Sequence, residues 1–430
     1  MKFMSTQDHT AQASFSEAVF SGLAPDQGLY VPASFPALSK KLLTNLQQAS
    51  LPDLSSAIMQ PFLAEIPDNE LADMLARALN FPIPLTRLEK QLYLLEVFHG
   101  PTLAFKDVGA RFMAGVLAYY SSGKKSKVTI LVATSGDTGS AIAHAFHRAK
   151  NVEVFILYPS QKITLLQEMQ MTTLGDNIHA LEVQGTFDDC QRLVKQALAD
   201  PELKSGMTLT TCNSINIARL LPQIIYHAWG LAQLKQMGEE KSPDLFVPSG
   251  NLGNLTSAVY ARQMGFDINM YIAALNNNTV FADYLSTQHF TPRPSVKTFA
   301  NAMDVGNPSN IERLLDLYHH DARKMQTDIQ AISINNPEIL TEIRQTYETT
   351  GVIIDPHTAV GLAAARRYHD QDRPAIITAT AHPAKFPEVI REALHIDIPL
   401  PESLQKVMVL KKKALLIAAD YKELVTCLTR

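Results

Sequence analysis

The sequence has few cysteines and no excess of charge of either sign. The three cysteines among its 430 residues, Cys190, Cys212 and Cys427, are scattered and odd in number. This excludes a disulfide-built extracellular domain and leads us to expect a cytoplasmic protein. The 38 Lys and Arg residues nearly balance the 42 Asp and Glu residues, so no strong field attracts nucleic acid or an anionic membrane. We therefore expect a small-molecule ligand, with neither nucleic acid nor membrane as a partner.

Long apolar runs and internal repeats are missing as well. No stretch reaches the roughly 20 apolar residues that a transmembrane helix needs, and residues 1–10 lack the apolar region of a signal peptide. The apolar content itself is ordinary, at 46%, in a chain long enough for two or three domains.

The pattern of apolar residues predicts an α/β fold. From Val128 onward, short β-branched runs alternate with helical stretches, as in VTILVAT (128–134) followed by GSAIAHAFHRA (139–149). Such alternation is typical of parallel strands joined by crossover helices. The first hundred residues lack this alternation, so we expect them to be mostly helical or irregular and to cap the core.

One lysine stands in an unusual setting, in the stretch HGPTLAFKDVGARF (99–112). Lys106 follows Phe105 directly, at the expected start of a helix. Burial lowers the pKa of a lysine amine and makes it a nucleophile for a carbonyl group. The alternative is an ordinary first-turn lysine that reaches solvent.

Two turns between a strand and a helix are candidate anion sites. In ATSGDTGSA (133–141), backbone N–H groups suit a carboxylate, although Ser135 or Asp137 also makes a good helix cap. In VPSGNLGNLTSA (247–258), the glycines allow a phosphate to approach the backbone, or serve only a tight turn. The second turn matches neither the dinucleotide nor the triphosphate motif.

Two further stretches carry polar groups in suggestive places. In TCNSINIARLLPQ (211–223), Ser214, Asn216 and Arg219 can face one anion, or Asn216 is a helix cap and Arg219 forms a surface ion pair. In IITATAHPAKF (376–386), Thr380 lies where a strand ends and can contact a ring nitrogen, or it is simply a good strand former. No cluster of metal ligands accompanies His144 and His147, so no metal site is expected.

Together these stretches form one set: an amine for an aldehyde, a cradle for its phosphate, a hydroxyl for its ring nitrogen and a turn for a carboxylate. The set and its order resemble the fold type II pyridoxal phosphate enzymes, and within them most closely the threonine synthases. The motifs that carry the resemblance span nearly the whole chain. They are GLYVP, FHGPTLAFKDVG, ATSGDTGSA, NSINIARL, VPSGNLGNLT, ANAMDVGNPSN, DPHTAVG and TAHPAKF.

The resemblance implies a role for each matching residue. Lys106 would be the Schiff-base lysine and the catalytic proton carrier, with Phe105 beside it. The remaining cofactor-binding residues would be Gly250, Asn251, Leu252, Gly253, Asn254 and Thr380. The substrate would be held by Ser135, Gly136, Asp137, Thr138, Ser214, Asn216 and Arg219. Among these, Asp137 is unexpected, because a carboxylate would repel the cofactor's phenolic oxygen unless it were protonated or turned away.

The implied fold is that of the tryptophan synthase β-like enzymes, with two parallel-sheet lobes and an N-terminal cap domain. We expect the cap over residues 1–98, a smaller lobe with the Schiff-base lysine over 99–210, and a larger cofactor-binding lobe over 211–430. A monomer or small homo-oligomer is expected.

The implied reaction converts O-phospho-L-homoserine and water to L-threonine and phosphate, with pyridoxal 5'-phosphate as cofactor. The alternatives are a related phospho-lyase that releases 2-oxobutyrate, a serine or threonine dehydratase, and a catalytically silent pyridoxal phosphate-binding regulatory protein.

Overall fold

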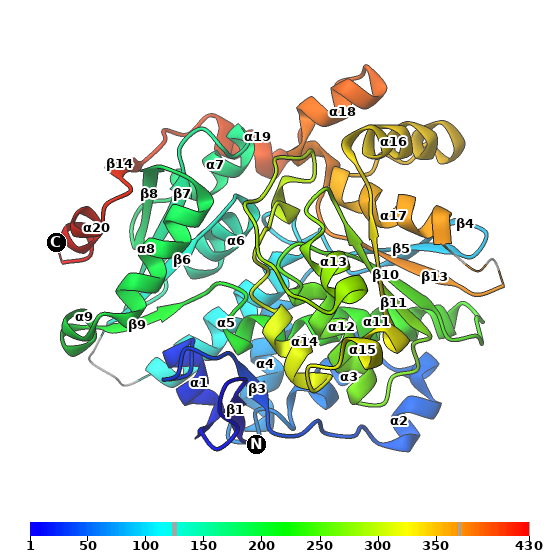
Figure 1. Cartoon of the computed structure of the whole chain (residues 1–430), viewed down its shortest axis with the longest axis horizontal. Coiled ribbons are helices and arrows are strands. Elements are labelled where there is room, and N and C mark those ends of the chain that lie inside the picture. The colour runs from blue at the N-terminus through cyan, green and yellow to red at the C-terminus, as the bar shows by residue number, and fades with distance from the viewer. Residues whose placement is uncertain (123–126, 369, 371, 430) are drawn as a thin grey trace.

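The computed structural model of the chain describes residues 1–122, 127–368, 370 and 372–429, and two β-sheets form its centre (Figure 1). The smaller sheet, on the left of Figure 1, has five parallel strands in the order β14-β8-β7-β6-β9. These are β6 (Val128–Ala133), β7 (Val152–Pro159), β8 (Ile178–Gln184), β9 (Thr208–Thr211) and β14 (Ala414–Ala418).

The larger sheet has six strands in the order β12-β11-β10-β13-β5-β4, and all of its pairs are parallel except β4 with β5. These strands are β4 (Leu85–Glu89), β5 (Leu92–Glu96), β10 (Asp244–Pro248), β11 (Met270–Leu275), β12 (Ile329–Ser333) and β13 (Ala375–Ala379). The predicted α/β fold with two parallel-sheet lobes is confirmed.

Helices cover both faces of the central strands, which explains why a strand such as β6 is buried along its whole length. In β6 every residue is buried. Ile130 and Val132 join one hydrophobic cluster, whereas Leu131 and Ala133 join another on the opposite face. Successive side chains of a strand point to opposite faces, so a strand covered on both sides must be apolar at every position.

The helices that follow the strands fall into two groups. Those around the smaller sheet are α6 (Asp137–Phe146), α7 (Leu165–Thr172), α8 (Phe187–Ala199), α9 (Pro201–Gly206) and α20 (Tyr421–Leu428). Those around the larger sheet are α11 (Gln223–Gln236), α12 (Gly253–Gln263), α13 (Val280–Thr287), α14 (Ile311–Leu317), α15 (Ala322–Asp328), α16 (Asn336–Thr350), α17 (Pro356–Tyr368) and α18 (Pro387–Leu394). Between the groups are α5 (Lys106–Ser121), α10 (Ile217–Leu220) and α19 (Glu402–Met408), with the 3-10 turns η2 (Asn301–Met303) and η3 (Pro383–Lys385).

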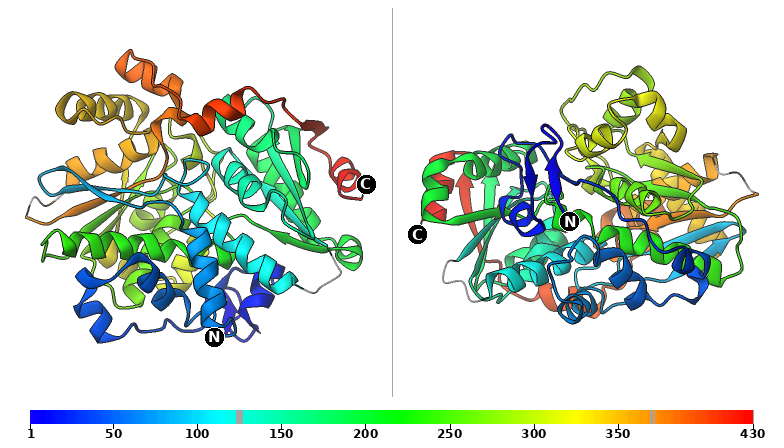
Figure 2. Two further views of the ribbon diagram at one scale, coloured as in Figure 1. Left: turned by 180° about the vertical axis from the view of Figure 1, so that it is seen from behind. Right: turned by 90° about the horizontal axis from the view of Figure 1, so that it is seen from below.

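The N-terminal segment lies across the lower side of both sheets (Figures 1 and 2). It has a small antiparallel sheet in the order β2-β1-β3, followed by helices. Its elements are β1 (Phe3–Ser5), β2 (Gln12–Ala13), α1 (Phe15–Ser21), β3 (Tyr30–Pro32), α2 (Lys40–Thr44), η1 (Leu46–Gln48), α3 (Leu51–Met59) and α4 (Asp68–Ala78).

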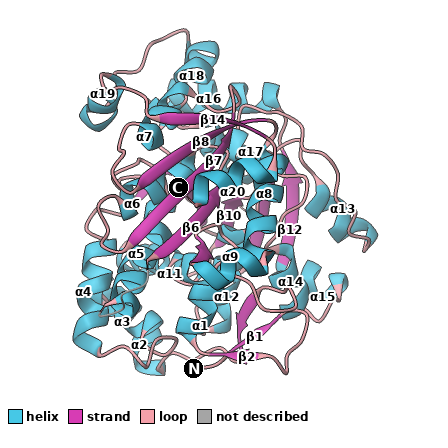
Figure 3. Cartoon of the chain, turned by 90° about the vertical axis from the view of Figure 1, so that its left-hand side faces the viewer, coloured by secondary structure: helices cyan, strands magenta, loops and turns pink. Residues whose placement is uncertain are grey.

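The sheets do not follow the domain boundaries that we expected from the sequence. Strands β4 and β5 lie within residues 1–98 but belong to the larger sheet, where Leu92 to Glu96 pair in parallel with Ala375 to Ala379. Strand β14 lies within residues 211–430 but extends the smaller sheet beside β8 (Figure 3). The chain therefore crosses between the two sheets after β5, after β9 and again after β13. None of the helices in the described ranges is both long and apolar enough to cross a lipid bilayer.

A buried arginine joins the N-terminal segment to the core. Arg313, in α14, is completely buried, and its guanidinium donates hydrogen bonds to the backbone oxygens of Tyr30 (3.0 Å), Ser214 (3.1 Å) and Ile215 (2.6 Å). No carboxylate pairs with it among the described residues. Its role is to satisfy carbonyl groups that have lost contact with water.

We expect the substitution Arg313→Met to lower the free energy of unfolding by about 3 kcal/mol or more, because it leaves three buried carbonyl groups unpaired at about 1–3 kcal/mol each. Denaturant unfolding of the purified variant measures the loss. The matched control is Arg323→Met on the exposed surface of α15, which should change stability by about 0.5 kcal/mol or less. Equal stabilities for the two variants would contradict this role for Arg313.

Candidate active site

The carboxyl ends of β6, β10 and β13 and the first turns of α5, α6 and α12 border one cavity. All of the predicted site residues except Gly136 and Asn216 line this cavity. They are Phe105, Lys106, Ser135, Asp137, Thr138, Ser214, Arg219, Gly250, Asn251, Leu252, Gly253, Asn254 and Thr380. The structure thus brings together residues that are up to 275 positions apart, from Phe105 to Thr380.

Lys106 is the first residue of α5, and its side chain faces the cavity. The helix start is fixed by a hydrogen bond from the Phe105 N–H to the Thr380 carbonyl oxygen (2.9 Å). Burial lowers the pKa of the Lys106 amine to about 8, and the nearby Asp137 carboxylate partly opposes this effect. Lys106 is half-buried at the cavity wall and its amine holds its proton weakly, so it can act as a nucleophile there.

The first turn of α12 is built to receive an anion. Leu252, just before the helix, has a left-handed backbone (φ 61°), and no side chain caps the first N–H groups of the helix. The side-chain amide nitrogen of Asn254 is buried and has no hydrogen-bond partner among the described residues, whereas its Oδ1 accepts from Tyr226 (2.8 Å). Unpaired donors of this kind, converging at a helix N-terminus, suit a phosphate group.

The glycines of this loop have different neighbours. A Cβ atom on Gly250 would lie 2.7 Å from the Cα atom of Met303, so the protein itself requires glycine there. A Cβ atom on Gly253, which lines the cavity, would make only ordinary contacts, with the side-chain nitrogen of Asn310 at 3.4 Å and the Cβ atom of Ser214 at 3.6 Å. Gly250 thus serves the close approach of η2, whereas the protein alone has room for a methyl group at Gly253.

Ser214 and Asn251 are connected by direct hydrogen bonds. The hydroxyl oxygen of Ser214 accepts from the side-chain amides of Asn251 (2.7 Å) and Asn310 (3.2 Å). Asn310 also donates to the backbone oxygen of Asn251 (3.0 Å). Because the Ser214 oxygen accepts twice, its own hydrogen remains available for an anion in the cavity.

Arg219 is buried, with 4% of its surface exposed, and no carboxylate pairs with it among the described residues. One terminal nitrogen donates to the Cys212 carbonyl oxygen, whereas its Nε atom has no partner. A buried guanidinium with free donor capacity is costly unless an anion is bound. This finding excludes the surface ion pair that the sequence left open.

Asn216 does not line the cavity. Its side-chain amide donates to the backbone oxygens of Val19 (2.9 Å) and Thr211 (3.0 Å), and its Oδ1 accepts from the Ala218 N–H (3.1 Å). All of its hydrogen-bonding groups are used within the protein, so Asn216 is a helix cap that anchors α1, and we do not assign it to substrate binding.

Gly136 also lies outside the cavity lining. Its N–H donates to the Thr134 hydroxyl (3.0 Å), which accepts from the Gly139 N–H as well (2.8 Å). Gly136 takes a backbone conformation (φ 131°) that turns the chain into α6, and it caps that helix in place of Ser135 or Asp137. The side chains of Ser135 and Thr138 remain at the cavity wall.

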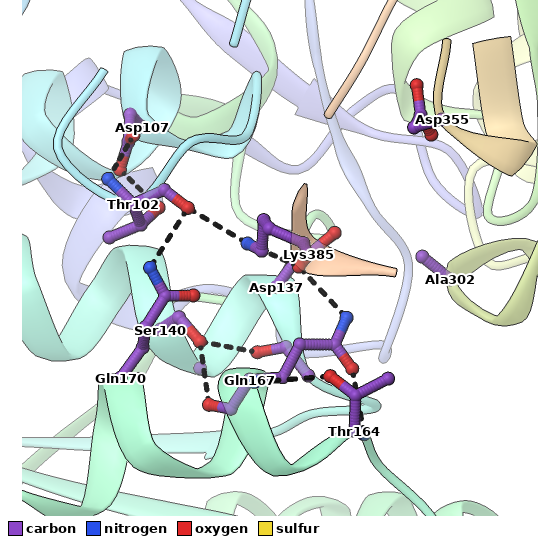
Figure 4. A network of polar contacts seen from close by, with 12 residues as sticks. Thr102, Asp107, Asp137, Ser140, Thr164, Gln167, Gln170, Ala302, Asp355 and Lys385 are labelled. Atoms are coloured by element: carbon purple, nitrogen blue, oxygen red, sulfur yellow. Dashed lines mark hydrogen bonds and ion pairs between the residues drawn. The ribbon is translucent and has the colours of Figure 1, made fainter. Parts of the chain in front are cut away.

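Lys385, a residue that the sequence pattern does not single out, explains how Asp137 is tolerated. Lys385, in η3, is completely buried, and its amine lies 2.7 Å from a carboxylate oxygen of Asp137 and donates to the Thr102 carbonyl oxygen (2.9 Å) (Figure 4). Gln167 donates to the same carboxylate (3.0 Å). Although burial opposes ionisation, the charge of Lys385 holds the pKa of Asp137 well below its usual range. Asp137 is therefore ionised and paired, not protonated.

A second missed residue is His357, in α17, which also lines the cavity. Its Nδ1 atom lies 2.8 Å from Asp355, and its Nε2 atom accepts a hydrogen bond from the Ala302 N–H (3.2 Å). These contacts fix the η2 turn against the glycine loop. The only sequence signals for Lys385 and His357 were their places in TAHPAKF and DPHTAVG.

Comparisons with known proteins agree with this geometry. The pattern of the family described as "Pyridoxal-phosphate dependent enzyme" matches residues 78–378, and those described as "Threonine synthase N terminus" and "Threonine synthase, C-terminal" match residues 2–79 and 358–426. The chain belongs to the threonine synthase family.

Threonine synthases from bacteria resemble the chain over almost its whole length. That of Serratia marcescens is 40% identical over 94% of this chain and 93% of its own. The crystal structure of the Escherichia coli threonine synthase superimposes with a TM-score of 0.94 at 38% identity, covering 100% of this chain and 99% of that one. The structure of the pyridoxal phosphate-bound threonine synthase from Brucella melitensis gives a TM-score of 0.92 at 32% identity, with 99% and 98% covered.

The cofactor of this family is pyridoxal phosphate, and the cavity fits it. The Lys106 amine is a partner for its aldehyde, and the uncapped turn of α12 with the unpaired Asn254 amide suits its phosphate.

The contrast between the two glycines gives a test of the cradle. We expect Gly253→Ala to change the free energy of unfolding without cofactor by about 0.5 kcal/mol or less, yet to raise the Kd for pyridoxal phosphate about tenfold or more, because the new methyl group fills the cradle. Gly250→Ala should instead destabilise the protein by about 1–3 kcal/mol, because Met303 must move. Unfolding experiments and cofactor titration measure the two effects. Cofactor binding by Gly253→Ala that matches the parent protein would contradict the assignment.

Proposed function

We propose that the chain converts O-phospho-L-homoserine and water to L-threonine and phosphate in this cavity. The observation that carries the proposal is the presence of two separate anion sites beside the Lys106 amine. One is the first turn of α12, and the other is the buried guanidinium of Arg219 with the hydroxyl of Ser214. A site for a phosphorylated cofactor and a phosphorylated substrate needs both.

The cofactor side of the cavity consists of residues from three elements. The loop residues Gly250, Asn251, Leu252, Gly253 and Asn254 would hold the phosphate, and Thr380, at the end of β13, would meet the ring nitrogen. Phe105 packs beside the amine, with its ring centre 5.6 Å from the Lys106 Nζ atom.

The substrate side consists of the turn before α6 and the stretch that leads into α10. Ser135 and Thr138 would hold the substrate carboxylate, helped by the N-terminus of α6. Arg219 and Ser214 would hold its phosphate. Asp137 lines the same wall, but its carboxylate is already bound to Lys385 and Gln167, so we assign it to the organisation of the turn.

Pyridoxal phosphate, when bound, supplies a conjugated ring that accepts the electrons released at the substrate carbons. Lys106 would act as the base that removes a proton from the α carbon and then one from the β carbon. Because its pKa is lowered to about 8, a fraction of the Lys106 amine is unprotonated near neutral pH. Arg219 and Ser214 would hold the phosphate as it leaves the γ carbon. Water supplies the hydroxyl group of the β carbon, while the γ carbon, the α carbon and the departing phosphate each take up one of the protons released from the α carbon, the β carbon and water.

Arg219 favours this reaction over its alternatives. A serine or threonine dehydratase acts on an unphosphorylated amino acid and has no use for a second phosphate site. A silent regulatory protein has no use for an amine with a pKa of about 8. The phospho-lyase uses the same substrate and differs only in its product.

We also propose a cytoplasmic location and a monomer or small homo-oligomer, with no nucleic-acid partner. Cys190 and Cys212 are buried free thiols whose pKa burial raises to about 12, which suits a reducing compartment.

The test is to incubate the cofactor-loaded protein with O-phospho-L-homoserine and to measure threonine, 2-oxobutyrate and phosphate. We expect threonine and phosphate in equal amounts. Mainly 2-oxobutyrate would assign the chain to the phospho-lyases, and no product would favour the silent protein.

The variant Arg219→Met should lower kcat/KM by about 100-fold or more, since the phosphate loses its buried cationic partner. Arg192→Met, on the exposed surface of α8, is the matched control and should keep the parent value. Unchanged kinetics in Arg219→Met would remove Arg219 from the substrate site.

A further inference from the structure

The charges around Lys106 come from several elements. Asp137 lies on α6, Lys385 on η3 and Arg219 on α10, and His357 on α17 also lines the cavity. Asp107, next to Lys106 on α5, points elsewhere, because its carboxylate accepts from the Thr102 N–H (2.8 Å) and hydroxyl (2.7 Å). Asp137 is thus the only carboxylate among the described residues at the cavity wall.

A lone buried carboxylate takes the nearest cation as its partner. Two amines compete for Asp137. The amine of Lys385 is in contact at 2.7 Å, and Lys106 acts on the same carboxylate from farther away. Without Lys385, the carboxylate would pair with Lys106 and hold a proton on it.

The position of Lys385 is itself fixed. Its amine also donates to the Thr102 carbonyl oxygen, which accepts from the Gln170 side chain (3.2 Å), and Gln167 binds Asp137 from the opposite side (Figure 4). The ion pair joins the turn before α6, in the smaller-sheet lobe, to the segment after β13, in the larger-sheet lobe.

We propose that Lys385 is a positioning residue for the reaction: it neutralises Asp137 and adds a positive charge beside Lys106, so that the nitrogen of Lys106 gives up its proton readily. The inference rests on the proposed function, in which Lys106 binds the cofactor and acts as the base. The direction of each charge effect on the pKa of Lys106 agrees with it: burial lowers this pKa most, the Asp137 charge raises it and the Lys385 charge lowers it.

The experiment is a pH titration of the visible absorbance of the cofactor-loaded protein, which reports the proton on the nitrogen that links Lys106 to the cofactor. We expect Lys385→Met to move the midpoint upward by about one pH unit or more, because the Asp137 charge becomes uncompensated. Asp137→Asn should move it downward, because Lys385 then stands alone. The double variant, which has neither charge, should lie between the two.

A purely structural role for the pair predicts shifts in the same direction, or none, and either result would overturn the proposal. The matched control is Lys412→Met, since Lys412 is also an ion-paired lysine but binds Glu168 and Glu182 on the outside of the smaller-sheet lobe. It should leave the midpoint unchanged. If Lys385→Met does not fold, the double variant is compared with Asp137→Asn, from which it differs only at Lys385. The titration midpoint of the double variant must then be the higher of the two, and equal midpoints would refute the proposal.

Failure of the proposed function has a different signature. If the parent protein shows no visible cofactor band, Lys106 is not the cofactor lysine. The same comparison is then made by competitive acetylation of the Lys106 amine, for which we expect a midpoint near pH 8 in the parent protein and a higher one in Lys385→Met.

Discussion

A lysine amine taken out of water binds its proton less tightly. The whole site depends on how the surrounding residues set the protonation of the Lys106 amine. Helix α5 begins at Lys106, with the Phe105 N–H bound to the carbonyl oxygen of Thr380 after β13, and partial burial at the cavity wall lowers the pKa of the amine. The Asp137 carboxylate, the one described at the cavity wall, would favour the protonated form of Lys106. Lys385, from the other lobe, forms an ion pair with that carboxylate and so reduces its effect on Lys106.

The same arrangement leaves the cavity with positive charge and unpaired donors. Within the part of the chain that the structure describes, Arg219 has no carboxylate partner, the amide nitrogen of Asn254 has no acceptor, and no side chain caps the start of α12. Each of these features costs stability in an empty site and is compensated when an anion binds. A phosphorylated cofactor and a phosphorylated substrate satisfy both groups of donors at once, so binding energy and chemistry come from the same charges.

The sequence predicts those features of the structure that depend on local pattern alone. Apolar strand runs such as Val128 to Ala133 predict a sheet covered on both faces, and the glycine loop before α12 predicts an anion cradle. The roles of residues whose partners are distant in the sequence cannot be predicted in this way. No local pattern gives Lys385 a role before the fold brings it to Asp137. The choice for Asn216 between helix cap and anion ligand depends on α1, which supplies the Val19 carbonyl. The sheet to which β5 and β14 belong cannot be predicted for the same reason, since both pair with strands that are distant in the sequence.

The most direct test of the central claim is to load the protein with pyridoxal phosphate, reduce it with borohydride and identify the modified peptide by mass spectrometry. We expect one pyridoxyl group on Lys106, which lines the cavity, and none on Lys385, whose amine contacts Asp137. Modification of Lys385, or a loaded protein in which Lys106 stays unmodified, would contradict it.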